Sequence, residues 1–293
     1  MRTSVGCLNP DPLRLLTMRT AAGYFFMDKQ KFLKPPIDVL QQIDLLKQRN
    51  LSVHNLPFLK HSLSTVGYYR LTGYCKIFQD DDHIFKPNTT FQHIWELYSF
   101  DQELRILVIN AIAKIEVALR ASITNVMSMQ FDSHWYLNSK LFKNEYLHNL
   151  LMQKIIKICQ EPKEVFLLHY FEKYVDEYPP SWMIFECISF GTLSKAFRSL
   201  RNMQHKRKIS EVFGYHSTLI ESWLESLCYN RNLCAHHSRL WNRWFTMTPQ
   251  IPHKLSTFTK FNTRIANKFY AQALIITLLL KNICPDYNWS QEL

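Results

Sequence analysis

The longest helical pattern in the chain covers residues 91–129, FQHIWELYSFDQELRILVINAIAKIEVALRASITNVMSM. Its apolar residues recur every three or four positions, the spacing that puts side chains on one face of an α-helix. Thr89 or Thr90 would cap its first turn. The same periodicity dominates the rest of the chain, so the sequence predicts an all-α protein.

Shorter helical patterns flank this segment. The polar run 79–90, which contains three consecutive aspartates and a proline, is expected to be a loop. Only 6 glycines occur in 293 residues, which argues against a turn-rich β architecture and a nucleotide-binding glycine loop. Helices are expected at residues 37–50, 55–78, 144–158, 165–175, 181–203 with an interruption at Gly191, 218–245 and 263–283.

The charge of the chain favours a polyanionic partner. Lys and Arg number 35 against 24 Asp and Glu, which gives a net charge of +11. A membrane surface is the competing polyanion, but the most apolar segment, 271–280, is far shorter than the roughly 20 residues of a spanning helix. We expect that segment to be a buried C-terminal helix and the protein to bind no membrane.

The seven cysteines are odd in number and scattered, which fits reduced thiols and a cytoplasmic protein. Residues 1–26 lack a sustained apolar stretch, and Met27 is expected to be the usual initiator. The expected organisation is therefore an N-terminal extension (1–26), an N-terminal helical region (27–90) and a larger helical domain (91–293) with enough apolar content for a core.

A basic and histidine-containing motif occupies residues 231–243, RNLCAHHSRLWNR. If the helix 218–245 is continuous, Asn232, His236, Arg239 and Arg243 share one polar, cationic face. Arg231 then lies roughly 140° around the axis from His236. Two arrangements bring them together: the arginine side chain swings round the helix, or the arginine of one copy approaches the histidine of another across a two-fold axis.

An arginine and a histidine suffice for one kind of RNA chemistry. The 2′-hydroxyl of RNA is an internal nucleophile, so a protein needs only a proton acceptor or donor near neutrality and a cation for the charge that develops at phosphorus. His236 and Arg231 supply one each. An isolated histidine on a helix is more often structural than catalytic, and this simpler interpretation stands beside the catalytic one.

The string 231–243 resembles the R-x(4)-H signature of HEPN ribonucleases, in the form found in Abi-like (abortive infection, AbiD/AbiF type) proteins. Residues 34–51, 66–74, 115–123 and 179–197 are similar to the same family. The resemblance implies a HEPN-type helical bundle with additional N-terminal helices, a homodimer, and metal-independent RNA cleavage by Arg231, His236 and the polar Asn232. It also implies an antiphage toxin, in some relatives controlled by a structured noncoding RNA.

Further residues are candidates for RNA contact. A basic run lies upstream of the motif, and its role as a phosphate-binding surface is weighed evenly against that of a solvated helix face. Tyr68, Tyr69, Arg70 and Tyr74 could stack on unpaired bases, although core packing is favoured for the aromatic residues. The predicted RNA-binding residues are Arg239, Arg243, Lys195, Arg198, Arg201, Lys206, Arg207 and Lys208.

Metal chemistry is disfavoured. Cys228, Cys234, His236 and His237 are close in sequence, but their spacing does not match that of zinc ligands. We expect no metal and no cofactor. His237 is expected to pack on the helix face that carries Leu233, although a catalytic exchange with His236 stays open.

Two functional hypotheses follow from the sequence. The first is an endoribonuclease in which His236 acts as general base or general acid and Arg231 stabilises the transition state. The second is a non-cleaving RNA-binding protein that uses the same cationic surface to hold a structured RNA.

Overall fold

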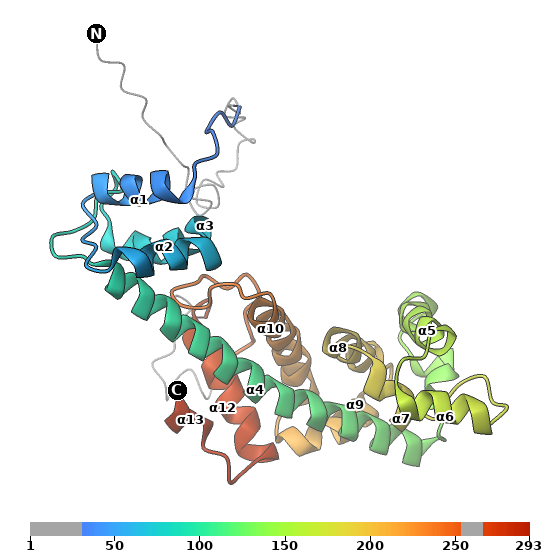
Figure 1. Cartoon of the computed structure of the whole chain (residues 1–293). Coiled ribbons are helices and arrows are strands. Elements are labelled where there is room, and N and C mark those ends of the chain that lie inside the picture. The colour runs from blue at the N-terminus through green and yellow to red at the C-terminus, as the bar shows by residue number, and fades with distance from the viewer. Residues whose placement is uncertain (1–30, 253–265) are drawn as a thin grey trace.

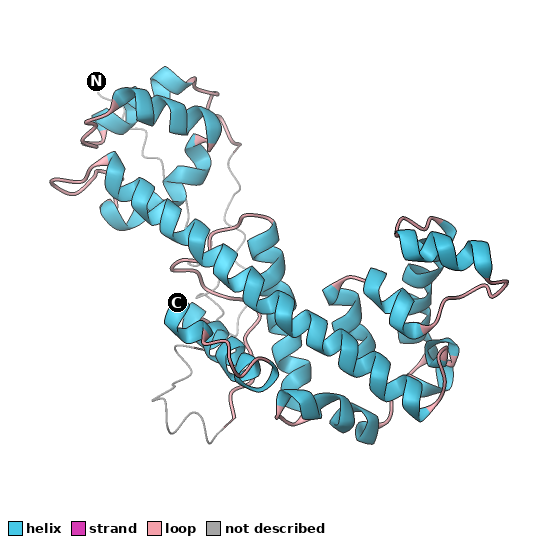
Figure 2. Cartoon of the chain, turned by 60° about the horizontal axis from the view of Figure 1, so that its bottom comes forward, coloured by secondary structure: helices cyan, strands magenta, loops and turns pink. Residues whose placement is uncertain are grey.

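The computed structural model describes residues 31–252 and 266–293, and helices are the regular elements of these residues (Figure 2). This confirms the all-α prediction. The helices are α1 (Val39–Gln48), α2 (Leu56–Thr65), α3 (Tyr68–Cys75), α4 (Phe91–Gln130), α5 (Glu145–Gln160), α6 (Val165–Lys173), α7 (Ser181–Cys187), α8 (Phe190–Ser199), α9 (Met203–Ser210), α10 (Ser217–Ala235), α12 (Phe269–Ile283) and α13 (Trp289–Glu292), with short 3₁₀ turns between some of them.

Helix α4 is the axis of the molecule. It has 40 residues and begins after Thr90, whose side chain accepts a hydrogen bond from the His93 N–H, as the sequence predicts. Figure 1 shows α1–α3 at one end of α4, α5–α7 at the other, and α10 and α12 along its middle. The other helices are therefore arranged around the two ends and the middle of α4.

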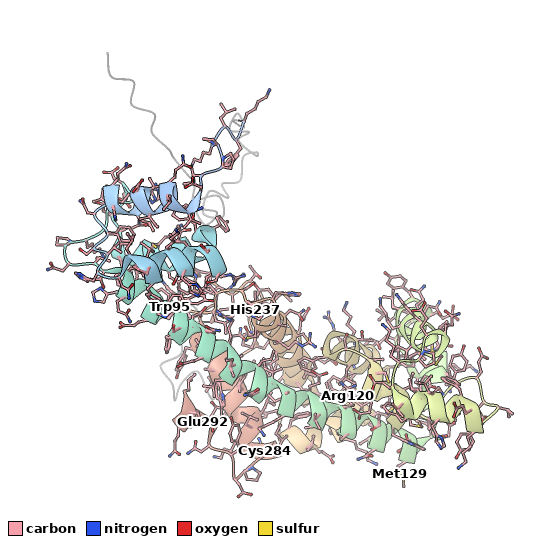
Figure 3. All side chains as sticks on the ribbon, viewed as in Figure 1. Trp95, Arg120, Met129, His237, Cys284 and Glu292 are labelled. Carbon is pink, nitrogen blue, oxygen red and sulfur yellow. The ribbon has the colours of Figure 1, made fainter. Side chains whose placement is uncertain are left out.

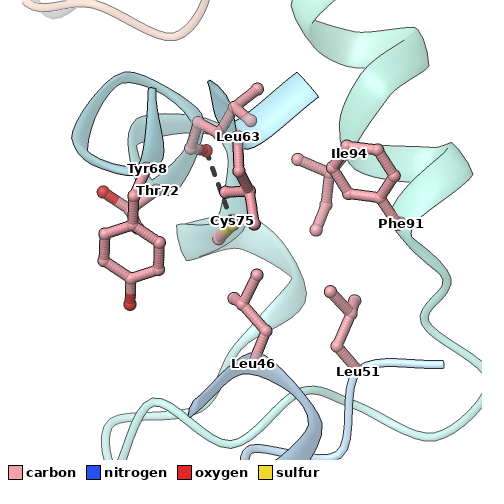
Figure 4. Close-up of a pocket in the computed structure, with 9 residues that line it drawn as sticks. Leu46, Leu51, Leu63, Tyr68, Thr72, Cys75, Phe91 and Ile94 are labelled. Carbon is pink, nitrogen blue, oxygen red and sulfur yellow. Dashed lines mark hydrogen bonds between the residues drawn. The ribbon is translucent and has the colours of Figure 1, made fainter. Parts of the chain in front are cut away.

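Two hydrophobic cores lie along α4. The larger one contains the stretch of α4 from Leu104 to Met127 together with residues of α5, α7–α10 and α12. The smaller one joins α1–α3 to Phe91 and Ile94 at the start of α4, around a small apolar cavity (Figure 4). The expected division at residue 90 remains a prediction, because α4 belongs to both cores; residues 1–26 lie outside the described part.

The second half of the chain departs from two helical expectations. The pattern 181–203 breaks between Cys187 and Phe190, where Ser189 caps α8 by accepting from the Thr192 N–H, so Gly191 lies inside a helix and does not interrupt one. The motif helix is shorter than expected, as described below. The helix expected at 263–283 is α12, which begins at Phe269 and ends at Ile283 as predicted; most of its apolar residues are buried, and residues 263–265 lie outside the described part.

No helix in the described residues combines the length and the apolar character that crossing a membrane requires.

Candidate functional site

Helix α10 ends at Ala235, in the middle of the motif, so the prediction of one helix over residues 218–245 is wrong. His236 is the C-cap and His237 adopts φ 54°, a left-handed conformation. The His237 N–H donates to the Cys234 carbonyl (3.0 Å) and the Ser238 N–H to the Leu233 carbonyl (2.8 Å). This pair of bonds is a Schellman motif, which satisfies the last carbonyls of the helix and turns the chain away from its axis.

The turn removes the predicted continuous cationic face. Arg239 and Arg243 follow the turn and no longer stand above His236; the Arg239 guanidinium donates to the Gly73 carbonyl of α3. Arg243 donates to the Arg239 carbonyl (3.3 Å) and to the Tyr229 hydroxyl (3.4 Å). Both side chains are half-buried and engaged within the protein. His237 does not share a helix face with Leu233 either, and it is exposed.

Within the motif, Arg231 and Asn232 lie in the last turns of α10 and His236 is its C-cap. Arg231 Nη1 donates to Asn232 Oδ1 (3.2 Å), so the guanidinium bends around the helix towards Asn232. Asn232 lies one turn before His236, and the His236 N–H donates to the Asn232 carbonyl (3.0 Å). His236 is exposed. The Arg231 guanidinium thus contacts the neighbouring Asn232, and both arrangements that would bring it to His236 stay open.

The thiols beside the motif are chemically quiet. Burial raises the pKa of Cys228 to about 12, with Glu116 adding to the rise and Arg231 opposing it. Burial also raises the pKa of Cys234 to about 12. Neither thiol forms an appreciable thiolate near neutrality, so neither is a nucleophile. In residues 31–252 and 266–293, no group of three or more His, Cys, Asp or Glu side chains is arranged to hold a metal ion.

The basic residues upstream of the motif differ in solvent exposure. The exposed ones are Lys195, Arg198, Arg201, Arg207 and Lys208. Lys206 is fully buried, and its ammonium donates to Glu221 Oε1 (2.6 Å) and to the Arg198 carbonyl (2.7 Å). The predicted role of Lys206 in RNA binding is therefore a misassignment, because its side chain is fully buried and its ammonium binds groups inside the fold.

The aromatic residues of α3 differ in exposure as well. Tyr74 is buried and Tyr68 is half-buried, in line with core packing, whereas Tyr69 is 93% exposed. Of the three tyrosines, Tyr69 alone presents its ring to solvent and is able to stack on a base.

Sequence reasoning missed a buried aspartate that supports the motif. Asp101 of α4 is 0% exposed and pairs with Arg105. Its carboxylate also accepts the Tyr74 hydroxyl (2.7 Å) and the backbone N–H groups of Leu240 (3.0 Å) and Trp241 (2.6 Å). The available signal was an aspartate followed four residues later by an arginine within an apolar helix, a pattern that exposed helices also show.

One comparison with known proteins gives a match. The family model described as Abi-like protein matches residues 61–242, which is more than half of the chain and runs from α2 through the turn after α10. No curated protein and no solved structure matches the chain.

Proposed function

Because the chain belongs to the family of Abi-like proteins, we propose that it is a metal-independent HEPN-type endoribonuclease that acts as the toxin of an antiphage abortive-infection system. The observation that carries the proposal is the bond from the Arg231 guanidinium to Asn232, one turn before the exposed imidazole of His236. A permanent cation and an imidazole that can accept or donate a proton thus stand at the same end of α10.

The proposed reaction is an internal transesterification of RNA. His236 accepts the proton of the 2′-hydroxyl, and the 2′-oxygen forms a bond to phosphorus. Arg231 stabilises the negative charge that develops on the phosphoryl oxygens. The bond from phosphorus to the 5′-oxygen breaks, the leaving oxygen takes a proton, and the products are a 2′,3′-cyclic phosphate and a 5′-hydroxyl.

A second copy of the chain completes this scheme. One imidazole cannot accept and donate a proton in the same instant, whereas a homodimer brings two His236 and two Arg231 side chains to one cleft. The exposed end of α10 leaves room for such an approach. In the proposed cytoplasmic homodimer, one His236 serves as general base and the other as general acid.

The exposed basic residues supply the RNA contact. Lys195, Arg198, Arg201, Arg207 and Lys208 are solvent-accessible on a chain of net charge +11. Arg198 forms an ion pair with Glu225 (3.2 Å), and Arg201 donates to the Phe142 carbonyl (3.0 Å). We propose that this surface binds substrate RNA and a cognate structured noncoding RNA that controls the toxin.

Cleavage of labelled RNA in the presence of EDTA tests the proposal. The wild type is compared with Arg231→Ala, His236→Ala and, as a control, His61→Ala, which removes an exposed histidine of α2. We expect Arg231→Ala and His236→Ala to lose about 10²- to 10⁴-fold in rate while RNA binding persists. Full cleavage by either variant would remove that residue from the mechanism. RNA binding without cleavage by the wild type would favour the non-cleaving RNA-binding protein.

Mixing the wild type with an excess of the inactive His236→Ala variant tests the homodimer. If one cleft uses the His236 imidazoles of both copies, subunit exchange leaves most wild-type chains in mixed dimers with a single imidazole, and cleavage per wild-type chain falls. A monomer by light scattering with undiminished cleavage would contradict the shared cleft.

A further inference from the structure

Two arginine side chains form reciprocal hydrogen bonds between helix α3 and the segment that follows α10. Arg70 of α3 donates from its guanidinium to the backbone carbonyl of His237, and Arg239 donates to the backbone carbonyl of Gly73 in α3. The two bonds join residues that are 167 and 166 positions apart in the sequence, and each arginine binds the main chain of the other element. Hydrogen bonds from a charged donor are about twice as strong as neutral ones, so the two elements are held together at this point.

Asp101 secures the same segment from the side of α4. Its carboxylate accepts the N–H groups of Leu240 and Trp241, which lie directly after Arg239. The same carboxylate accepts the hydroxyl of Tyr74, one residue after the carbonyl that Arg239 reaches. The end of α3, the N-terminal half of α4 and residues 237–241 therefore form one polar junction.

The backbone between α10 and this junction has little freedom. The Schellman bonds attach His237 and Ser238 to the last turn of α10, and Arg70 donates to the carbonyl of His237. His237 keeps a left-handed conformation that costs a non-glycine residue free energy and persists where surrounding contacts impose it. His236 is the residue directly before it. In Figure 3 the label of His237 stands at the end of α10 that faces the N-terminal helices.

We infer that Arg70 is a positioning residue of the site: by binding the His237 carbonyl, it fixes the turn that carries the His236 imidazole. Helix α3 then contributes to the geometry of the site. The effect of Arg70 on cleavage rests on the proposed function. General acid or base catalysis requires the imidazole within hydrogen-bond reach of the reacting proton, so a small displacement of this turn lowers the rate of the chemical step more than it weakens RNA binding.

The experiment uses the full-length protein and three variants. Arg70→Ala removes the contact, Arg70→Lys keeps a cationic donor, and Lys60→Ala removes one positive charge from an exposed position of neighbouring α2. The first readout is kcat and KM for RNA cleavage. The second is hydrogen–deuterium exchange of the amides in residues 236–241, which does not depend on activity.

We expect Arg70→Ala to lower kcat by about 10- to 100-fold with KM changed less than about twofold, to speed amide exchange in residues 236–241, and to be partly rescued by Arg70→Lys. Lys60→Ala should behave as the wild type in both readouts. Cleavage by Arg70→Ala equal to that by Lys60→Ala would overturn the inference and leave the proposed nuclease intact. A change in KM alone would also overturn it, because Arg70 would then bind RNA directly.

The two proposals fail differently. If the wild type cleaves no RNA, the proposed function falls, and exchange in residues 236–241 still decides whether Arg70 holds the turn. Amide exchange in residues 236–241 that is unchanged in Arg70→Ala would show that Arg70 does not fix the turn.

Discussion

Helix α4 carries two acid–arginine pairs of identical spacing with different roles. Asp101–Arg105 lies in its N-terminal half and Glu116–Arg120 in its C-terminal half, both at i and i+4. The Asp101 and Arg105 side chains are 0% and 5% exposed, whereas that of Glu116 is 18% exposed. The carboxylate of the first pair accepts backbone N–H groups of the motif, those of Leu240 and Trp241, so the same sequence pattern supports the candidate site in one place and stabilises the scaffold in the other.

The second pair works through its arginine. Arg120 donates to the carbonyls of Phe185 and Ile188 at the end of α7 (3.2 Å for Ile188) and also lies 3.6 Å from Glu186. The guanidinium therefore keeps partners even without Glu116. In the first pair the aspartate has the larger number of partners, and the Arg105 guanidinium donates to Asp101 and to the Tyr74 hydroxyl. Neutralising the two acids should accordingly have unequal effects.

The largest expected effect is that of Asp101→Asn. The change leaves the Arg105 charge buried without its counter-ion, which lowers the free energy of unfolding by about 3–5 kcal/mol. It also loosens the backbone at Leu240 and Trp241. Urea unfolding measures the first effect, and amide exchange at these two residues measures the second. A loss below about 1 kcal/mol would show that the junction at Asp101 contributes little to the fold.

A smaller effect is expected for Tyr74→Phe, which removes one donor from Asp101. Loss of a hydrogen bond to a charged group costs about 1.5–3 kcal/mol. Burial first, and then the hydrogen bond to Asp101, raise the pKa of Tyr74 above its usual value. A raised folded-state pKa stabilises the fold fully below the unfolded pKa near 10, and this contribution falls by about 1.4 kcal/mol per pH unit above it.

The difference in stability between wild type and Tyr74→Phe should therefore be constant from pH 7 to 9 and shrink between pH 10 and 11. Urea unfolding across this range checks it. A difference that grows with pH would mean that the folded state releases the Tyr74 proton more readily than the unfolded chain does.

Glu116→Gln is the matched neutralisation in the second pair, and its effect should be smaller still. Arg120 keeps its carbonyl partners, and the pair is partly open to water, so the free energy of unfolding should fall by no more than about 1 kcal/mol. RNA cleavage should be unchanged. A loss of cleavage with normal stability would give Glu116, which also influences Cys228 near Arg231, a role in the site itself.

The contrast also shows which features the sequence predicts. Local signals were sufficient for α4, because its periodicity is continuous and Thr90 caps it from an adjacent position. The end of α10 could not be predicted, because no glycine or proline marks it; the chain stops at a histidine in a left-handed conformation, held by Arg70 and Asp101 from distant parts of the sequence. The burial of Lys206 depends on Glu221 of another helix and has no local signal.

The candidate site was predictable only in part. Arg231, Asn232 and His236 were identified from their string, but their mutual geometry depends on where the helix ends. Arg239 and Arg243 were placed on the wrong face for the same reason. Asp101 was missed, and Arg70 was considered only for RNA contact, because the backbone groups that they bind have no sequence signature.

The smallest expected effect sharpens the contrast at the turn itself. His237→Gly relieves the left-handed conformation, since glycine adopts positive φ without steric cost and is the preferred residue at this position of a Schellman motif. We expect the free energy of unfolding to rise by about 0.5–1 kcal/mol. Urea unfolding measures the gain, and His237→Ala, which retains a β-carbon, should not show it. The carbonyl that Arg70 binds is kept in both variants, so kcat should stay at the wild-type value. If kcat instead falls in both variants to the level of His236→Ala, the imidazole of His237 takes part in the chemistry, and the turn held by Arg70 and Asp101 presents two catalytic histidines in place of one.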